Sequence, residues 1–240
     1  PPGFVITAQA YDYFIEKAGL KDEMKKLLDE INYNNTKQLD DVAKKVRGMI
    51  INSKFPEEMR REIVRAYEKL GADNMRIDEI RKRISESVFV AVRSSATAED
   101  LADASFAGQQ ESFLNVKGND DLIESVKKCF ASLYTSRATY YRQKKGFKHE
   151  DTKLAVVIQR MVDSDKSGVI FSKDPSYNNE NIIIESVFGL GEGIVSGMIT
   201  PDKYIVSRDL KILETRIGDK KKAITRNSGG QNIEVALTKE

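Results

Sequence analysis

The amino-acid sequence predicts an α+β fold with two lobes, in which a helical N-terminal half precedes a mixed β-sheet. Up to residue 70, apolar residues recur at helical spacing. From Val88 onward the pattern changes to short apolar runs separated by turn-forming residues. A chain of 240 residues is long enough for one large domain or for two lobes that share a core. We therefore expect a helix-rich lobe over residues 1–150 and a β-rich lobe over residues 151–240.

The N-terminal helices are predicted from apolar residues that recur on one face. In the third of them, Leu39, Val46 and Ile50 fall on the same side of the helix. Pro56 before the fourth helix and Gly71 after it are typical start and stop residues. The predicted helices cover residues 8–18, 21–31, 38–51 and 57–70, after an extended start at PPGFVIT.

The second part of the chain predicts strands around one further helical region. That region covers residues 119–145 and has a potential break near Tyr134. The final stretch, from KKKAITRNSGG onward, is polar and contains glycine, so we expect it to be loosely structured. The predicted strands cover residues 88–93, 112–116, 153–162, 167–172, 181–187, 203–207 and 211–217.

The composition is that of a soluble globular protein, with 40% hydrophobic and 32% charged residues. No apolar stretch approaches the roughly 20 residues that a membrane-spanning helix needs. A net charge of +2 is too small to predict nucleic-acid or membrane partners. The single cysteine, Cys129, excludes an internal disulfide and fits a reducing cytosol, so we expect a cytoplasmic protein.

Residues 88–116 carry the most informative pattern, VFVAVRSSATAEDLADASFAGQQESFLNV. A β-branched run leads to Arg93, at the start of a loop rich in Ser, Thr, Ala and Gly. Small residues let a backbone approach a ligand closely, and successive N–H groups in such a loop attract anions. The planar guanidinium of Arg93 matches phosphate oxygens. The segment therefore predicts a phosphate loop over residues 93–110 and nucleoside triphosphate binding; the structural alternative is an ordinary strand–loop–strand with a surface arginine.

AVRSSATAED and DASFAGQQESFLNV also resemble the signature of the phosphoenolpyruvate synthase and pyruvate phosphate dikinase family, in its nucleotide-binding domain. The resemblance extends from PPGFVIT to GLGEGIVSGMITPD, with the motifs in the family's order. It implies an ATP-grasp-like fold whose two lobes hold the nucleotide, with ATP as a substrate and Mg²⁺ as its companion. In the phosphate loop it implies that Ser105, Ala107 and Gly108 face the terminal phosphates. It also implies that Arg137 lies near the triphosphate, with a surface salt bridge as an equal alternative.

The resemblance places LAVVIQRMVDSDKSGVIFS at a hinge between the lobes. Backbone groups of Met161 and Val162 are expected to bond adenine there, and Gln159 is a candidate polar contact beside it. Backbone pairing suits adenine, because its N6 donor and N1 acceptor match a strand's own C=O and N–H groups. An ordinary edge strand is the alternative.

Two carboxylates in the β-rich lobe are further candidates. Glu185 ends an apolar run, where a carboxylate can bind ribose hydroxyls or serve as a tentative Mg²⁺ ligand. Glu192, in GLGEG, lies at an apparent helix start, where an acidic residue also stabilises the helix dipole. Helix stabilisation and ligand contact both stay open for Glu192. GLGEG lacks the G-x-G-x-x-G spacing of a dinucleotide fingerprint.

The family passes a phosphoryl group through a histidine, and this chain has one histidine, His149. Its surroundings, HEDTKL, do not resemble the family's Gly-Gly-containing phospho-accepting motif, so we expect His149 in an exposed loop. The resemblance places the accepting histidine on a following domain, and no catalytic residue is assigned in this chain. It also implies a lysine upstream and metal-binding acidic residues beyond Glu240. We therefore expect a truncated domain that is inactive by itself.

The resemblance thus implies the ATP-binding, phosphoryl-donating domain of a phosphoenolpyruvate synthase. By resemblance, the whole enzyme converts ATP, pyruvate and water into phosphoenolpyruvate, AMP and phosphate. Its partners would be a phosphohistidine domain and a pyruvate-binding barrel domain of the same enzyme. The alternatives are the ATP domain of another dikinase, such as pyruvate phosphate dikinase or rifampin phosphotransferase, and a non-catalytic interaction module with the same fold.

Overall fold

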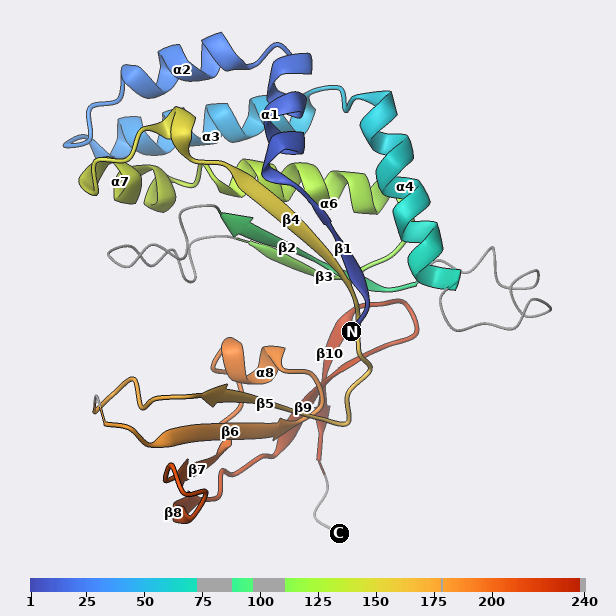
Figure 1. Cartoon of the computed structure of the whole chain (residues 1–240), viewed down its shortest axis with the longest axis vertical. Coiled ribbons are helices and arrows are strands. Elements are labelled where there is room, and N and C mark those ends of the chain that lie inside the picture. The colour runs from blue at the N-terminus through green and yellow to red at the C-terminus, as the bar shows by residue number, and fades with distance from the viewer. Residues whose placement is uncertain (73–87, 97–110, 178, 238–240) are drawn as a thin grey trace. The chain divides into compact units, whose positions relative to one another are not determined.

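The computed structural model describes residues 1–72, 88–96, 111–177 and 179–237 (Figure 1). The chain divides into two compact units, Pro1–Met161 and Val162–Glu240. Both contain helix and antiparallel sheet, which confirms the mixed α and β composition expected from the sequence. Each unit is described by itself below.

The first unit is built on a four-stranded antiparallel sheet in the order β1-β4-β2-β3. Its helices lie on one face of this sheet, with α1 and α6 nearest to it (Figure 1). The strands are β1 (Gly3–Ile6), β2 (Val90–Ala96), β3 (Ser112–Val116) and β4 (Leu154–Arg160). The helices are α1 (Ala8–Lys17), α2 (Lys21–Asp29), α3 (Thr36–Asn52), α4 (Glu57–Ala72), α6 (Asn119–Ser132), α7 (Ser136–Lys144) and the short 3-10 helix η1 (His149–Asp151).

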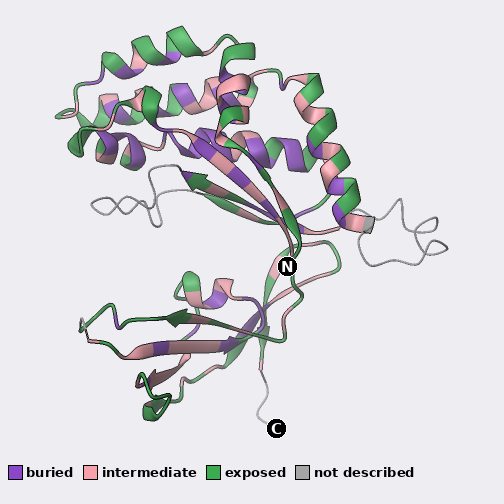
Figure 2. Ribbon diagram, in the orientation of Figure 1, coloured by how far each residue is buried: buried purple, intermediate pink, exposed green. Residues whose placement is uncertain are grey.

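The central strand β4 shows why the helices cover only one face. Leu154, Val156 and Ile158 alternate along it and are fully buried beneath the helices. The residues between them point to the opposite face and are half-buried, as the alternating colours of the strands show (Figure 2). Phe14 and Phe130 complete the core from α1 and α6, with ring centroids 5.4 Å apart. Among the described residues of this unit, no helix lies on the opposite face, which is called the uncovered face below and is where a ligand could lie.

The second unit holds a four-stranded antiparallel sheet in the order β5-β6-β7-β8 and a separate hairpin. Its small core consists of Val187, Leu190, Ile199 and Ile224. The elements are β5 (Lys166–Phe171), β6 (Ile182–Phe188), the short helix α8 (Glu192–Val195), β7 (Asp202–Val206), β8 (Ile212–Arg216), β9 (Lys222–Arg226) and β10 (Asn232–Ala236).

Gly189, the first residue of GLGEG, joins the end of β6 to β9. It has a φ of +79°, and a Cβ there would lie closer than 3.0 Å to the carbonyl oxygen of Ile224. That same oxygen accepts the Leu190 N–H at 2.7 Å. Backbone geometry therefore requires glycine at the first position of the GLGEG motif, because only glycine combines this φ with so close an approach to another backbone atom.

Most predicted elements are confirmed to within a few residues, including the break after α6 near Tyr134. The expectation of a loosely structured C-terminal stretch was wrong, because its residues pair as the β9–β10 hairpin. The expected lobe border at residues 150/151 also differs from the observed division. The reason is that β4 hydrogen-bonds to β1 and β2, so it belongs to the sheet of the first unit.

Candidate functional site

The uncovered face of the first sheet brings Arg93 and Gln159 close together. Arg93 of β2 lies opposite Val157 of β4, and Ala91 lies opposite Gln159. Directly opposed residues of an antiparallel pair share one face of the sheet. Arg93 and Gln159 are therefore diagonal neighbours on that face, at the roughly 7–8 Å typical of such positions.

Two exposed apolar side chains lie on the same face as this pair. Val5 of β1, 55% exposed, lies opposite Val157, and Leu114 of β3 is exposed two residues after Ser112, which pairs with Arg93. Apolar side chains beside an amide and a guanidinium can contact a planar ring and an anion at the same time. The face thus offers the two kinds of contact that a nucleotide needs.

The ends of the predicted phosphate loop lie beside Arg93. The Ser94 hydroxyl donates to the carbonyl of Glu111 at 3.1 Å, which ties the last part of β2 to the start of β3. The Arg93 side chain is exposed at this position. Ser105, Ala107 and Gly108 lie outside the described residues, so their role towards the phosphates stays a prediction.

Arg137 lies in the first turn of α7, with an exposed side chain. The Thr135 side chain caps this helix by accepting the Ala138 N–H at 3.2 Å. The preceding helix α6 contacts β2 and the residue that precedes β3, because the Cys129 sulfur lies 3.7 Å from the Val92 carbonyl oxygen and 3.9 Å from that of Glu111. Arg137 therefore follows a helix that contacts β2 and the residue before β3, and its closeness to the triphosphate stays a prediction.

The predicted adenine hinge coincides with the division of the chain, which falls between Met161 and Val162. The Met161 N–H donates to the carbonyl of Phe89 at 2.9 Å, inside the first unit. Any adenine pairing at Met161 must therefore use its carbonyl oxygen and not its N–H. Val162 is 54% exposed. The adenine hinge stays a prediction. The hydrogen bond to Phe89 removes the Met161 N–H from the backbone groups that could bind adenine.

In the second unit, Glu185 lies half-buried in β6, on the same face as the buried Ile183 and Val187. Lys203 of β7 is directly opposite Glu185 in the register. Within the described residues, no group of three or more His, Cys, Asp or Glu side chains is placed to hold a metal ion. Glu185 alone supplies one carboxylate, which is compatible with the few protein ligands that Mg²⁺ commonly takes.

Glu192 occupies the first turn of α8, where its charge favours the helix dipole. Its carboxylate accepts a hydrogen bond from the side-chain amide of Asn232 in β10, and its carbonyl accepts from the Ser196 hydroxyl at 2.6 Å. The residue thus has a structural role that links α8 to the hairpin. A ligand contact at Glu192 stays a prediction and would compete with the Asn232 bond.

Comparison with known proteins decides the family. All 240 residues, 1–240, match the model of the family described as pyruvate phosphate dikinase, AMP/ATP-binding domain. The chain belongs to this family. The resemblance noted in the sequence is confirmed, and the chain is an ATP-binding domain of the phosphoenolpyruvate synthase kind.

Similar full-length proteins carry the name phosphoenolpyruvate synthase. A probable phosphoenolpyruvate synthase of Archaeoglobus fulgidus is 48% identical over 241 residues, covering 100% of this chain and 30% of that protein. The phosphoenolpyruvate synthase of Aeropyrum pernix is 44% identical, over 99% of this chain and 28% of its own length. That of Pyrococcus furiosus is 41% identical, over 95% of this chain and 31% of its own length. The chain thus spans less than a third of the length of these relatives.

His149 differs from its expected place in this AMP/ATP-binding domain. It was predicted in an exposed loop, but it is half-buried in η1, and the ring packs against Tyr33 with 2.7 Å between Nε2 and the Tyr33 hydroxyl. Arg142 Nε donates to its Nδ1 at 3.1 Å. Burial, with the charge of Arg142, lowers the pKa of His149 to about 4, so the ring is neutral at physiological pH.

Arg142 itself was missed by the sequence analysis. It is fully buried, donates to the Leu133 carbonyl at 2.5 Å, and lies 5.4 Å from the centroid of the Tyr134 ring. In the sequence it stands in YYRQKK, where an arginine resembles any solvated surface cation, so no local signal distinguishes it.

Among the described residues, no helix is long and apolar enough to cross a membrane.

Proposed function

We propose that this chain is the nucleotide-binding, phosphoryl-donating domain of a phosphoenolpyruvate synthase, with an ATP-grasp-like fold. The observation that supports this best is the shared position of Arg93 and Gln159 on the uncovered face of the β1-β4-β2-β3 sheet. The names of the relatives support the enzyme class. The whole reaction converts ATP, pyruvate and water into phosphoenolpyruvate, AMP and phosphate.

In the proposed complex, positive groups hold the triphosphate at the end of β2. Arg93 contacts the phosphates, Arg137 approaches from α7, and the loop that carries Ser105, Ala107 and Gly108 encloses the terminal phosphates. Phosphoryl transfer needs positioning and charge neutralisation more than covalent participation by the protein. Arginine suits this task because its donors form a planar fork with permanent charge.

The base and the metal ion occupy other proposed positions. Gln159 and the backbone of Met161 and Val162 bind adenine, with the Met161 carbonyl as acceptor. Glu185 binds a ribose hydroxyl or Mg²⁺, and Glu192 contacts the nucleotide if it releases Asn232. Mg²⁺ would neutralise phosphate charge and favour oxygen ligands such as the Glu185 carboxylate.

The phosphoryl acceptor is proposed to be a histidine on another domain of the longer enzyme, which then serves a pyruvate-binding barrel domain. His149 is unsuited to accept the group, because both of its ring nitrogens are engaged, by Arg142 and Tyr33. The proposed location is the cytoplasm, in agreement with the single, buried and free Cys129.

Two other functions were weighed. Another dikinase would share this domain, but the similar proteins named above are phosphoenolpyruvate synthases. A non-catalytic interaction module would not need an exposed arginine and a glutamine side by side on an open sheet face. Both alternatives are therefore less well supported than phosphoryl donation.

Calorimetric titration with ATP and with AMP, each with and without Mg²⁺, tests the proposal. Arg93→Ala should weaken ATP binding at least tenfold, about 1.4 kcal/mol or more, and AMP binding much less, because AMP lacks the β- and γ-phosphates. Gln159→Ala should weaken both ligands alike. Arg61→Ala, an exposed arginine on α4, is the matched control. Equal effects of the Arg93 and Arg61 substitutions on ATP would refute the proposed site.

A further inference from the structure

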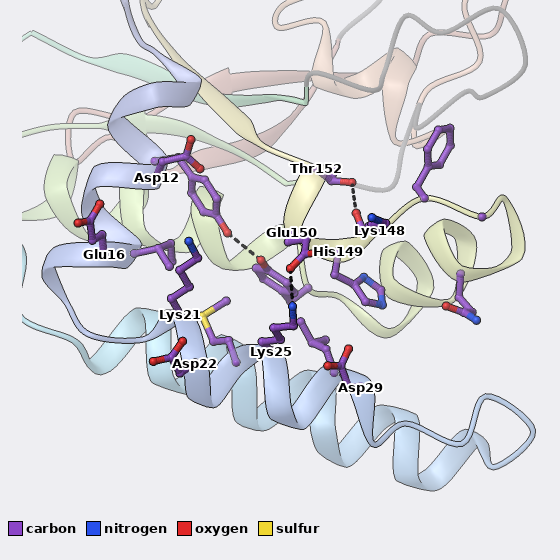
Figure 3. A pocket seen from close by; sticks show the side chains of 18 residues that line it. Asp12, Glu16, Lys21, Asp22, Lys25, Asp29, Lys148, His149, Glu150 and Thr152 are labelled. Atoms are coloured by element: carbon purple, nitrogen blue, oxygen red, sulfur yellow. Dashed lines mark hydrogen bonds and ion pairs between the residues drawn. The ribbon is translucent and has the colours of Figure 1, made fainter.

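The first unit holds a cavity of about 800 Å³ between α1, α2 and η1, and its charged groups are balanced within the chain (Figure 3). Lys25 and Glu150 meet there, 2.9 Å apart, and Asp12 is paired with Lys153. With Lys153 and the buried Arg142 counted, the carboxylates that line the cavity are matched by as many cations. The second unit differs at β8, where free backbone groups, apolar side chains and charges lie on one exposed strand.

Strand β8 is an edge strand with free backbone groups. Within the described residues, it lies at one end of the sheet order β5-β6-β7-β8 and pairs with β7 alone (Figure 1). Its residues 214–216 pair regularly with β7, and the irregularity in the register falls before them. The N–H and C=O groups that point away from β7 can therefore pair with a further strand. Residues 212–217, ILETRI, contain neither proline nor lysine, the residues that commonly protect such an edge.

Apolar side chains lie exposed at both ends of this edge. Leu213 is 57% exposed and Ile217 is 69% exposed. Each is two residues from Thr215, so the three side chains share one face of the strand. Thr215 lies opposite Tyr204 of β7, which continues this face onto the neighbouring strand.

The opposite face of β8 carries one acid and one base. Arg216 Nε donates to the Glu214 carboxylate, and both side chains are partly exposed. Within the described part of the chain, the two terminal amino groups of Arg216 donate no hydrogen bond. Lys203 of β7 lies between Glu185 and Arg216 in the register, so a like charge lies on one side of this guanidinium. A second carboxylate on the free side would offset that charge and accept from the unused donors.

The segment 213–217, LETRI, is complementary to itself in antiparallel register. A pairing centred on Thr215 sets Thr215 opposite its own copy, Glu214 opposite Arg216, and Leu213 opposite Ile217. Each contact then occurs twice, as a two-fold interface requires. The apolar side chains of both copies stay on the same face, because directly opposed residues share a face. A pairing centred on Glu214 or on Arg216 would instead oppose like charges.

The other edge of this sheet, β5, lacks such complementarity. Its sequence, KSGVIF, has Lys166 as its single charged residue. Pairing with a second copy would therefore bring no opposite charge to this lysine. A lysine on an edge strand also opposes pairing with another chain. The charge pattern thus distinguishes β8 from β5.

We propose that β8 is a docking edge for a second copy of this chain, in a two-fold dimer whose two sheets form one continuous antiparallel sheet. Each Glu214 contacts Arg216 of its own chain and Arg216 of the second copy. A strand of this length spans about 17 Å and buries less than the roughly 800 Å² per partner of a standard interface, so the dimer is weak. We expect a dissociation constant on the order of 100 μM. The proposal does not depend on the nucleotide site.

Sedimentation equilibrium of the full chain, from about 10 μM to about 1 mM, measures this association. The mass should rise towards twice that of one chain and stop there, because a two-fold contact closes. Hydrogen exchange of the β8 amides should slow at the higher concentration, since the free edge is then paired.

Charge reversal tests the register. Glu214→Arg and Arg216→Glu each oppose like charges in a homodimer, so each should weaken self-association at least tenfold. Mixed in equal amounts, the two variants should associate with each other at least as tightly as the native chain does with itself, because every opposed pair then joins unlike charges. Lys222→Glu reverses a half-exposed β9 cation that is paired with Glu234, and it should leave self-association unchanged.

Circular dichroism of each variant checks that folding is unchanged, as expected for partly exposed side chains on an edge strand. A monomer at the highest concentration, or a mass above that of a dimer, would overturn the proposal. Self-association that survives both single reversals, or that the mixed variants fail to restore, would overturn it as well.

Discussion

Replacement of Gly189 by alanine should strongly destabilise the second unit. The residue has a φ of +79°, a left-handed conformation that costs about 1–2 kcal/mol for a residue with a Cβ. The new Cβ would also collide with the Ile224 carbonyl oxygen, which must then move. Its hydrogen bond from the buried Leu190 N–H would be lost, at about 1–3 kcal/mol.

Together these effects predict a loss of about 2–5 kcal/mol in the free energy of unfolding of the second unit. Gly197→Ala is the matched control, because Gly197 has a similar φ of +70° but no atom within 4 Å of the added Cβ. The control should lose only the backbone cost of about 1–2 kcal/mol.

Urea unfolding followed by circular dichroism gives the two free energies, and hydrogen exchange at Leu190 shows whether the bond to Ile224 opens. Gly189→Ala should lower the unfolding midpoint clearly more than Gly197→Ala and should accelerate exchange at Leu190. Equal midpoints for the two variants would refute the reasoning, because the close approach to Ile224 would then have no energetic weight.

Two further predictions concern buried ionisable groups. The pKa of His149 is lowered to about 4 from an ordinary 6.5, so between these pH values the unfolded chain binds a proton that the folded chain does not. The free energy of unfolding should therefore fall as the pH falls from about 6.5 to about 4. The expected loss is about 1–2 kcal/mol, given the partial exposure of the ring. His149→Gln should flatten this part of a stability-against-pH curve, and an unchanged slope would contradict the assignment. Burial raises the pKa of the Cys129 thiol to about 12, so Ellman's reagent at pH 8 should label it only after unfolding. Labelling of the native protein at the rate of the unfolded protein would show that the thiol is accessible.

The sequence predicted elements best where one physical signal dominated. The helices α3 and α4 followed from apolar spacing with clear boundaries, and the break expected near Tyr134 falls between the end of α6 and the start of α7. The β9–β10 hairpin was missed because its two strands are short and mix charged with apolar residues, with Ala223 and Ile224 buried in β9 but Ile233 and Val235 exposed in β10, and because their pairing depends on the turn between them.

The candidate nucleotide site was predictable only where a local sequence signal marked a residue. The position of Arg93 at the end of an apolar run could be read locally, and its closeness to Gln159 required the register of β2 against β4. The membership of β4 in the first sheet could not be deduced, because pairing with β1 joins residues about 150 positions apart and depends on the whole fold. The buried Arg142 and the cavity beside it likewise arise from packing between α1, α2 and η1.

The place of β4 at the centre of the first sheet has a consequence for synthesis of the protein on the ribosome. β1, the helices α1 to α4 and β2 all leave the ribosome before the strand that joins β1 to β2 exists. At roughly 5–20 residues per second, β1 waits on the order of ten seconds or longer for its partner. During that time the apolar faces of the helices have no completed sheet to cover, so nascent chains should depend on chaperones until Arg160 has emerged.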